Sequence, residues 1–473
     1  MEPLASALQR YRQKRVTIMG LGSFGGSIGL AKFLCQAGAH VTITDLKPAE
    51  VLQDSIRQLS GYPVTFVLGE HREEDFSSPD YLFISPAIPE DSPYLALARA
   101  AGVPIDTEMN LFFRLCPGTI VGITGSHGKT TTTSLTGALV KHVYPRTWVG
   151  GNIGRSLLLD LDKIRQDDLV ILELSSFQLE DLQAMEQSPP IAALLNIFPN
   201  HLDRHRSMEN YIEAKMGIFR YQRPEDRAII NADNPILRTL TSRIPGRQIY
   251  FSVEKPLDRG VYVEGNWLVS TLGKQKERVC TLEDIPLLGR HNIANVAAAI
   301  AIAQTCGVAE ATMRPIIQNF TPVPHRLELV AVREGVRFYN DSIATTPQAT
   351  LAALEAFSEP ILLIAGGYDK GIPFDRLGRV IARRVKEAFL IGKSASHIAR
   401  AIEEGKKEVG GESTAEITFC PDLPAAVQQA WKKAKPGDIV LLSPACASYD
   451  QFQNFMERGD LFKRIVQQLG TRG

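Results

Sequence analysis

No two cysteines of this 473-residue sequence are spaced as C-x-x-C, and the six cysteines are scattered along the chain. Scattered thiols do not describe a disulfide framework, so free thiols in a reducing cytoplasm are the simplest interpretation. The sequence also lacks a run of about 18 apolar residues and an apolar core near its first residues. We therefore expect neither a membrane span nor export.

An excess of either charge is missing as well. Lys and Arg together number 52, as do Asp and Glu, so the formal net charge is zero. A broad electrostatic grip on nucleic acid requires a positive excess, and we expect no nucleic-acid partner. Neither a low-complexity tract nor a periodic repeat occurs. The composition is that of a globular protein, and the length exceeds what one core usually reaches (about 250–300 residues), which implies two to four domains.

The most informative stretch is Gly125-Ser126-His127-Gly128-Lys129-Thr130-Thr131, which follows an apolar strand-like segment and precedes a helix-like run at 134–142. Glycines let backbone N–H groups surround phosphate oxygens, and a helix N-terminus adds partial positive charge. Lys129 would neutralise the β- and γ-phosphates, and the Thr130 hydroxyl would bind Mg²⁺. The match to G-x-x-x-x-G-K-[ST] is incomplete because Ile123 stands where glycine is required. The position between strand and helix still favours ATP binding over a structural turn.

A second glycine motif, Gly20-Leu21-Gly22-Ser23-Phe24-Gly25, lies between a strand at 16–19 and a helical run, and Asp45 ends the next strand. A G-x-G-x-x-G turn in a βαβ unit, with an acid about 20 residues further on, is typical of dinucleotide sites. Alone, it indicates NAD, with a ligand-free tight turn as the alternative. Ser85 follows another strand, at the end where open α/β sheets bind ligands.

Glu173 and His201 each follow an apolar strand, so both are expected on the rim that carries Lys129. Separately, the acid could cap a helix and the histidine could lie in a surface loop. Next to a phosphate loop, they indicate Mg²⁺ ligands or phosphate partners. Asn292 and Asn295 begin an alanine-rich helical run, where asparagines are more often caps.

After the proline-broken segment 321–326, strands at 337–339, 361–365, 388–391 and 439–443 alternate with helical runs. This alternation predicts a third, mostly parallel sheet.

Taken together, six stretches occur in the order found in the Mur ligases, and the chain resembles that family over essentially its whole length. They are residues 125–131, 173–180, 200–203, 291–292, 324–326 and 340–342. Mur ligases are bacterial enzymes that join amino acids to a UDP-N-acetylmuramoyl precursor of peptidoglycan. The boxes at 173–180 and 443–452 resemble those of the members that add D-glutamate.

The resemblance implies an α/β fold of three domains, each a mostly parallel sheet with flanking helices. Residues 1–107 would form a Rossmann-like domain for the UDP substrate, residues 108–322 a P-loop-type ATPase domain, and residues 323–473 a Rossmann-like domain completing the ATP and amino-acid sites. The first glycine motif would then hold uridine diphosphate rather than NAD. The implied contacts of the UDP substrate are Gly20, Leu21, Gly22, Ser23, Asp45, Ser85, Asn152 and His201.

The implied reaction is ATP-dependent addition of D-glutamate to UDP-N-acetylmuramoyl-L-alanine through an acyl phosphate and a tetrahedral intermediate. It would take place in the cytoplasm, with small-molecule substrates, no membrane partner and a monomeric chain. The ATP contacts would be Gly125, Ser126, His127, Gly128, Lys129, Thr130, Thr131, Asn292, Asn295, His325, Arg326 and Asp341. The D-glutamate contacts would be Thr345, Lys370, Ser448 and Phe455.

Two Mg²⁺ ions are implied, with Thr130, Glu173, His201 and Lys215 as ligands; the last three, with Lys129, would be the catalytic residues. By position alone, Lys215 is an ordinary helix lysine. It resembles, however, a family lysine that CO₂ carbamylates into a carboxylate-like metal ligand. A lysine crowded by cations loses its proton more easily, and only the neutral amine reacts with CO₂.

Two residues depart from the pattern of the D-glutamate-adding members. His127 stands where asparagine is frequent and resembles the L-alanine-adding members, and Ile343 stands where some members carry a lysine whose task would pass to Lys370. Addition of L-alanine to UDP-N-acetylmuramate is therefore the first alternative. An NAD-dependent dehydrogenase, which leaves the Lys129 loop unexplained, and a non-catalytic nucleotide-binding protein are the others.

Overall fold

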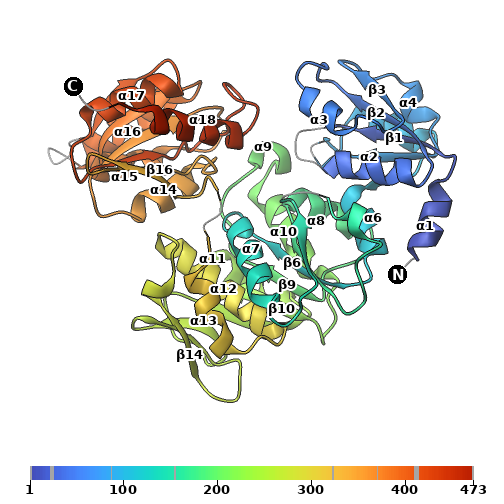
Figure 1. The fold of residues 1–473 in the computed structure, drawn as a ribbon, viewed down its shortest axis with the longest axis horizontal. Helices are drawn as coiled ribbons and strands as arrows, with labels where there is room; N and C mark the ends of the chain where they lie inside the picture. The colour runs from blue at the N-terminus through green and yellow to red at the C-terminus, as the bar shows by residue number, and fades with distance from the viewer. Residues whose placement is uncertain are drawn as a thin grey trace.

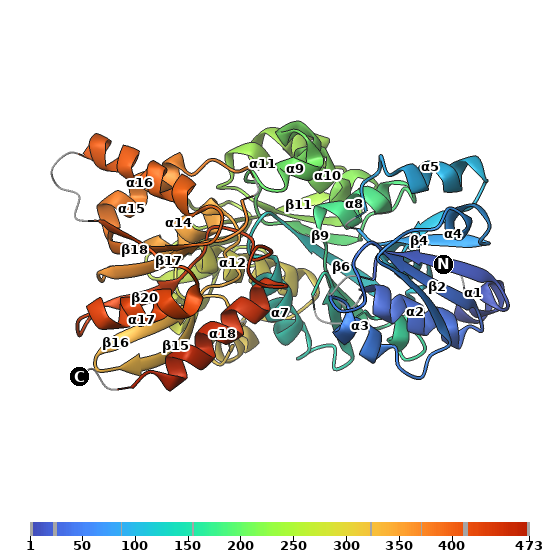
Figure 2. The same ribbon diagram turned by 90° about the horizontal axis from the view of Figure 1, so that it is seen from above.

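The computed structural model describes residues 3–21, 26–86, 88–153, 156–321, 324–369, 371–409 and 415–470. They form three lobes, each with its own β-sheet: an N-terminal lobe, a central lobe and a C-terminal lobe (Figure 1). Seen from above, the N-terminal and C-terminal lobes lie on opposite sides of the central one (Figure 2). All six cysteines are free thiols. None of the helices described here combines the length and apolarity that crossing a bilayer requires.

The N-terminal sheet has five described strands, all parallel, in the order β3-β2-β1-β4-β5. Its strands are β1 (Arg15–Met19), β2 (His40–Asp45), β3 (Val64–Leu68), β4 (Tyr81–Ile84) and β5 (Ile105–Thr107). Its helices are α1 (Leu4–Tyr11), α2 (Gly26–Gln36), α3 (Gln53–Gln58), α4 (Glu74–Ser77) and α5 (Pro93–Ala100), and α6 (Glu108–Leu115) leads into the central lobe.

Nine described strands form the central sheet, in the order β14-β13-β12-β11-β10-β9-β6-β8-β7. The strands from β7 to β12 in this row run parallel, and β13 and β14 extend it antiparallel. Their bounds are β6 (Thr119–Thr124), β7 (Thr147–Gly151), β8 (Leu169–Glu173), β9 (Ile191–Leu194), β10 (Arg227–Asn231), β11 (Arg247–Ser252), β12 (Gly260–Glu264), β13 (Trp267–Ser270) and β14 (Glu277–Thr281). Every residue of β8 is buried, as expected for a parallel strand covered on both faces.

The helices of the central lobe are α7 (Lys129–Val140), α8 (Ser176–Gln183), α9 (Leu202–His205), α10 (Met208–Arg220), α11 (Pro235–Leu240), α12 (Arg290–Thr305) and α13 (Glu310–Gln318). The alanine-rich α12 packs beside α7, since small side chains allow close approach and favour helix. Helix α7 begins at Lys129, five residues before the run at 134–142 read from the sequence, because four threonines after the lysine fit into the helix and are buried or half-buried.

The C-terminal sheet has the order β15-β16-β20-β17-β18-β19, parallel except for the edge pair β15–β16. Its strands are β15 (Glu328–Arg333), β16 (Val336–Asn340), β17 (Ile361–Gly366), β18 (Val385–Ile391), β19 (Glu416–Phe419) and β20 (Ile439–Leu442). Its helices are α14 (Pro347–Glu355), α15 (Asp375–Arg384), α16 (Ala395–Val409), α17 (Leu423–Lys433) and α18 (Phe455–Gln468).

The apolar cores show how the lobes are joined. One cluster runs continuously from Ala7 in the N-terminal lobe to Ile244 in the central lobe. The two clusters of the C-terminal lobe contain residues between Leu327 and Leu469 alone. The N-terminal and central lobes therefore share buried apolar surface, whereas the C-terminal lobe has cores of its own.

Candidate active site

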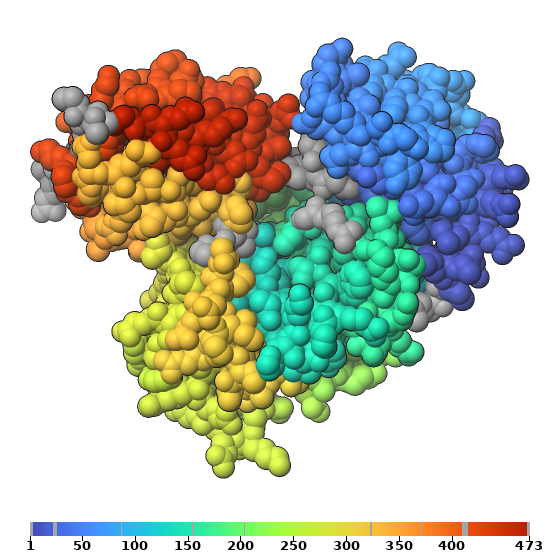
Figure 3. All heavy atoms as spheres, in the orientation of Figure 1, coloured from blue at the N-terminus to red at the C-terminus, as the bar shows by residue number. Residues whose placement is uncertain are grey.

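The carboxyl ends of β6, β8 and β9 lie together at one edge of the central sheet, because these strands are parallel neighbours. A cleft of about 2610 Å³ opens above this edge and is lined by all three lobes. Figure 3 shows the C-terminal lobe at the upper left and the N-terminal lobe at the upper right, both above the central lobe. Sixteen residues expected from the sequence line this cleft: Leu21, Ser85, Ser126, His127, Gly128, Lys129, Thr130, Asn152, Glu173, His201, His325, Arg326, Asp341, Thr345, Ser448 and Phe455.

The glycine loop after β6 is held from several sides. The amide of Asn196 accepts from His127 N at 2.9 Å and donates to its carbonyl at 3.0 Å. The Ser126 hydroxyl lies 2.9 Å from the Tyr211 hydroxyl. Gly128 has a φ of 84°, and a Cβ there would collide with the side-chain oxygen of Asn295. The loop therefore needs glycine at 128 both for its backbone conformation and for its packing.

Lys129, the first residue of α7, folds back over the loop. Its Nζ donates to the carbonyls of Gly125 at 2.9 Å and Ser126 at 3.1 Å. Burial lowers the pKa of Lys129, and nearby Arg326 lowers it too, while Glu173 raises it. The ammonium thus sits in the position from which the lysine of a phosphate loop reaches a triphosphate.

Glu173, at the end of β8, joins the phosphate loop to the strand beside it. Its carboxylate accepts from the Thr130 hydroxyl at 2.8 Å and from the Asn152 amide at 3.0 Å. The side chain is 3% exposed, so both contacts are shielded from bulk water. The carboxylate does not cap α8, because Ser175 and Gln178 form the capping box of that helix. The helix-cap alternative for Glu173 is therefore wrong.

Lys215, on α10, lies beneath the loop and is 2% exposed. Its Nζ donates to Thr124 Oγ1 at 3.0 Å and lies 5.4 Å from the centre of the Tyr211 ring. Burial holds the pKa of Lys215 well below its usual value, and the charge of Lys129 lowers it further. Such a lysine releases its proton more readily than a lysine in solvent. The ordinary solvated lysine expected from its position alone is not what the fold produces.

The cleft lining also contains the histidines His127 and His291 and the arginine Arg326. Burial, together with neighbouring cations, lowers the pKa of His127 to about 3 and that of His291 to about 4, so both rings are neutral near pH 7. Arg326 Nε is buried and has no hydrogen-bond partner among the described residues. Lys129 and Arg326 thus provide two cations in one cleft, an arrangement suited to a polyanion.

The side chains of this site could hold Mg²⁺ only together with oxygen atoms of a bound phosphate ligand. Within the described parts of the chain, no three His, Cys, Asp or Glu side chains are grouped so as to hold a metal alone. The Glu173 carboxylate and the Thr130 hydroxyl lie together at the loop, 2.8 Å apart. Mg²⁺ is commonly held by one or two carboxylates plus substrate phosphates, and this donor set fits that pattern.

His201 precedes α9, a one-turn helix flanked by two residues in the left-handed region, His201 at φ 52° and Arg206 at φ 65°. The His201 ring meets the Phe177 ring edge-on at 5.3 Å. In the same turn, Arg204 donates to the Ile88 carbonyl of the N-terminal lobe. The turn therefore places His201 at the junction of two lobes, not in an isolated surface loop.

On the C-terminal side, Asp341 follows β16 and is 4% exposed. It accepts from Leu327 N at 3.2 Å and from the Ser443 hydroxyl at 2.8 Å. Burial raises the pKa of Asp341 to about 7, although the nearby Arg326 charge lowers it. His325, in the left-handed region at φ 65°, lies 3.0 Å from the Asn340 amide.

Several expected site residues lie behind the cleft wall. Asn295 donates to Asn292 Oδ1 at 2.9 Å, and Asn292 donates to the Leu288 carbonyl, so both lie within α12 and neither caps it. Asp45 accepts from the backbone N–H groups of Leu21 and Lys47, each at 2.9 Å. It shapes the loop after β1. Gly20, Gly125, Thr131 and Lys215 are also absent from the cleft lining, while Gly22, Ser23 and Lys370 lie outside the described residues.

Three residues that matter for the site were not singled out from the sequence: Asn196, Tyr211 and Arg458. Asn196 and Tyr211 support the phosphate loop by the contacts given above. Arg458 is 1% exposed and bonds to loops on the C-terminal side. A polar residue two positions after the end of β9 could have marked Asn196, but the other two lie on helices, where spacing alone shows no such role.

Comparison with known proteins divides the chain along the same three lobes. Residues 14–106 match the model described as the Mur ligase MurD-like N-terminal domain. Residues 123–303 match the Mur ligase middle domain, and residues 325–446 match the Mur ligase glutamate ligase domain.

Curated relatives match over nearly the full length. A UDP-N-acetylmuramoylalanine--D-glutamate ligase of Roseiflexus sp. (strain RS-1) is 46% identical over 96% of this chain and 98% of its own. One of Acetivibrio thermocellus is 41% identical over 97% of both chains.

Among solved structures, a UDP-N-acetylmuramate-alanine ligase from Thermotoga maritima aligns with a TM-score of 0.64 at 19% identity, over 96% of this chain and 99% of that chain. A MurF ligase from the same organism, in complex with ADP, aligns with a TM-score of 0.58 at 16% identity, over 99% of this chain and 100% of that chain. Both confirm the α/β fold with three lobes.

Proposed function

The chain belongs to the Mur ligase family, and we propose that it is the ligase that joins D-glutamate to UDP-N-acetylmuramoyl-L-alanine at the expense of ATP. The observation that carries the proposal is the cleft in which Lys129, Glu173 and His201 meet, one from each of three strand ends of an ATPase-like sheet. Its full-length relatives bear the name of this activity. The domain ranges 1–107, 108–322 and 323–473 are our proposal for the three functional units.

The chemistry that this cleft must perform is activation of a carboxylate. A carboxylate resists attack by an amine until one of its oxygens becomes a good leaving group, and phosphorylation by ATP supplies that group. The amine of D-glutamate then attacks the acyl phosphate, and the tetrahedral intermediate collapses to an amide and inorganic phosphate. Catalysis of such a reaction consists mainly of positioning and neutralisation of charge.

The chain's own residues can be assigned to these tasks. Lys129 and Arg326 would neutralise the phosphates, and the loop amides and the α7 N-terminus would hold them. Thr130 and Glu173 would bind one Mg²⁺, which screens the phosphate charge when bound, and His201 would bind a second beside the substrate carboxylate. Two histidines of the cleft lining, His127 and His291, are uncharged near pH 7. Lys129 and Arg326 would therefore neutralise the phosphates without them.

Lys215 would complete the metal site after carbamylation. The ammonium first releases one proton, its neutral amine adds to CO₂ with formation of a C–N bond, and a second proton leaves to solvent, so a cation becomes an anion. The burial of Lys215 and the nearby Lys129 charge support this step, since both favour the neutral amine.

The other two lobes would supply the remaining substrates. The loop after β1, shaped by Asp45, would hold the uridine diphosphate, and Ser85 and Asn152 would contact the rest of that substrate. Thr345, Ser448 and Phe455 line the opposite wall and would surround D-glutamate. Asn292, Asn295, His325 and Asp341 would complete the nucleotide site once the C-terminal lobe closes. We propose that the protein acts in the cytoplasm as a monomer.

The test is phosphate release from ATP, measured with UDP-N-acetylmuramoyl-L-alanine and a panel of D- and L-amino acids. D-glutamate should give turnover at least about tenfold above any other amino acid. Turnover of UDP-N-acetylmuramate with L-alanine, and none with D-glutamate, would overturn the proposal. Fluorescence titration with NADH serves as the check on the dehydrogenase alternative, and we expect no saturable binding.

A further inference from the structure

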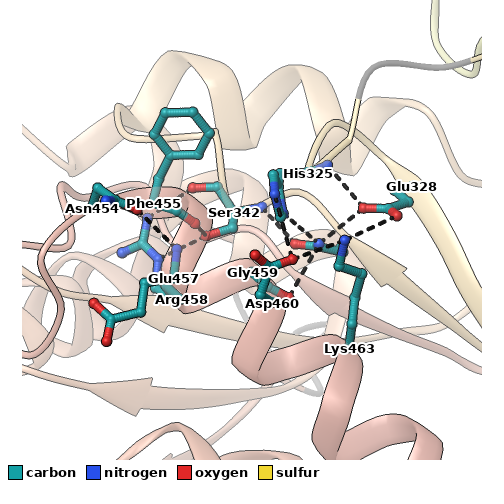
Figure 4. A network of polar contacts seen from close by, with 11 residues as sticks. His325, Glu328, Ser342, Asn454, Phe455, Glu457, Arg458, Gly459, Asp460 and Lys463 are labelled. Carbon is teal, nitrogen blue, oxygen red and sulfur yellow. Dashed lines mark hydrogen bonds and ion pairs between the residues drawn. The ribbon is translucent and has the colours of Figure 1, made fainter. Parts of the chain in front are cut away.

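The guanidinium of Arg458, in the second turn of α18, is among the largest fully buried side chains, with 1% exposure. Its Nε donates to Ser342 Oγ at 3.0 Å, and Nη2 donates to the Ser342 carbonyl at 2.8 Å and to the Cys446 carbonyl at 3.2 Å. Nη1 donates to the carbonyls of Cys446 at 3.2 Å and Ala447 at 3.4 Å. Figure 4 shows Arg458 beside Ser342. Its hydrogen-bond acceptors in the described structure are all uncharged.

Such an arrangement is costly. A buried charge is normally paired with an opposite charge, and neutral acceptors compensate its lost hydration only in part. Burial lowers the pKa of Arg458 to about 10, which leaves it cationic near pH 7. An apolar residue of similar volume would fill the space at lower cost, so stability alone does not account for an arginine here.

The acceptors of Arg458 belong to two different loops of the cleft. Ser342 follows Asp341 on the nucleotide side, while Cys446 and Ala447 lead into Ser448 on the amino-acid side. In a trans peptide, the carbonyl and the next N–H point in opposite directions. Anchoring the two carbonyls on the guanidinium therefore fixes the direction of the N–H groups of Ala447 and Ser448.

The beginning of α18 is tied to the same two loops. The Ser342 hydroxyl donates to the carbonyl of Phe455, the first residue of the helix, at 2.7 Å. One residue after Arg458, a Cβ on Gly459 would collide with His325 Nδ1, so helix and imidazole are in close contact (Figure 4). A displacement of Arg458 would therefore move its contacts as well, namely His325, Ser342 and the loop before Ser448.

We propose that Arg458 is a positioning residue that couples the amino-acid half of the C-terminal site to its nucleotide half. The fork of the guanidinium holds the loop before Ser448 at a fixed distance from the loop of Asp341. The amine of the bound amino acid is thereby aligned with the acyl phosphate. The inference rests on the proposed function, because it takes the Ser448 side as the place of the incoming amino acid.

The chain contains a matched control at the other end of the same helix. Arg333, on β15, donates from Nη1 to the Leu469 carbonyl at 3.1 Å and from Nη2 to the Gln467 carbonyl at 2.5 Å. It is a second guanidinium bonded to backbone carbonyls of the C-terminal lobe, and it does not line the cleft.

The experiment compares Arg458→Lys and Arg458→Met with Arg333→Lys and Arg333→Met in the full-length protein. Lysine keeps the charge but cannot bridge the acceptors in a fork. For Arg458→Lys we expect KM for D-glutamate to rise and kcat to fall, each by about tenfold or more, with KM for the UDP substrate changed less than twofold. Arg333→Lys should change none of these values by more than twofold. The Tm of each variant is measured alongside.

A second measurement uses Arg458→Ala with added guanidinium at millimolar concentration. Recovery of kcat by guanidinium, and none by methylammonium, supports a role for the fork. The inference is overturned if Arg458→Lys keeps the wild-type kcat and KM values, or if the KM values for D-glutamate, the UDP substrate and ATP all change equally. It is also overturned if neither Arg458→Lys nor Arg458→Met folds while the Arg333 variants do. If the wild-type protein itself fails to use D-glutamate, it is the proposed function that falls.

Discussion

Lys215 Nζ and Thr124 Oγ1 lie 3.0 Å apart beneath the phosphate loop, in a place from which water is largely excluded. The Thr124 hydroxyl donates a hydrogen bond to the Leu174 carbonyl at 2.6 Å, so its oxygen accepts the hydrogen bond from the Lys215 amine. Burial lowers the pKa of the Lys215 amine and thereby favours its neutral form. The pair links the last residue of β6 to α10 and places the amine near the Glu173 carboxylate, whose charge acts on it.

Replacement of Lys215 by Ala should lower kcat by at least about a hundredfold, because it removes the amine on which the proposed metal-binding carbamate forms. Formate or acetate at millimolar concentration should restore part of the activity by filling the place of the carbamate. Depletion of CO₂ and bicarbonate should slow the wild-type enzyme and leave the variant unaffected. The control is Lys141→Ala, on the exposed end of α7. Wild-type kcat in Lys215→Ala would show that the metal role is wrong.

Gly128→Ala should abolish ATP binding and lower Tm, because the new Cβ meets the Asn295 side chain in addition to the strain of a positive φ. Gly102→Ala separates the two effects. Gly102 has a similar φ of 70°, but nothing lies within 4 Å of an added Cβ. It should cost about 1 kcal/mol and leave KM for ATP unchanged. Equal losses in the two variants would mean that the contact with Asn295 is unimportant.

The succession of three mostly parallel sheets along the chain was predictable from the sequence, and so was the gathering of Lys129, Glu173 and His201 around one cleft. Apolar runs followed by glycine, acid or histidine place Lys129, Glu173 and His201 at one edge wherever the strands are parallel. What could not be read were the contacts that depend on packing. Asp45 ends a strand like any ligand-binding acid, yet its carboxylate accepts from the Leu21 and Lys47 backbone.

Burial was the other property that the sequence did not reveal. The residues around Lys215 do not show by their spacing whether this position of the helix faces solvent or the core. Arg458 appears in a charged stretch, Glu457-Arg458-Gly459-Asp460, which is typical of an exposed helix face. Tertiary packing of α10 and α18, rather than local pattern, places these two cations inside. The beginning of α7 was missed for a related reason, since four consecutive β-branched threonines are poor helix formers until a sheet and α12 cover them.

The raised pKa of Asp341 predicts that the stability of the protein depends on pH. This pKa is raised from 3.8 to about 7, so the folded state keeps a proton that the unfolded chain has already released between these values. The stabilising contribution of this group is therefore complete below about pH 4 and is lost as pH rises through 7. Asp341→Asn does not titrate. The difference in Tm between this variant and the wild type should become more positive, by about 2 °C or more, from pH 5.5 to pH 8.5.

The measurement is differential scanning calorimetry at the two pH values. Asp54→Asn, on the surface of α3, is the control and should show no such trend. The same difference at pH 5.5 and pH 8.5 for Asp341→Asn would contradict the buried, protonated carboxyl.

His127→Asn should lower kcat/KM for ATP by about three- to tenfold, because the loop is held through the backbone of residue 127 and the imidazole is uncharged. Asn196 binds the N–H and the carbonyl of that residue, and both groups remain in the variant. The pH profile between 6 and 8.5 should keep its shape, since the pKa of His127 lies far below this range at about 3. Asn196→Ala removes the amide that fixes the loop and should therefore raise KM for ATP more than His127→Asn does. If instead His127→Asn is the more damaging change, or if it removes an ionisation between pH 6 and 7, the imidazole acts on the nucleotide as a titrating group and the loop's geometry depends on it.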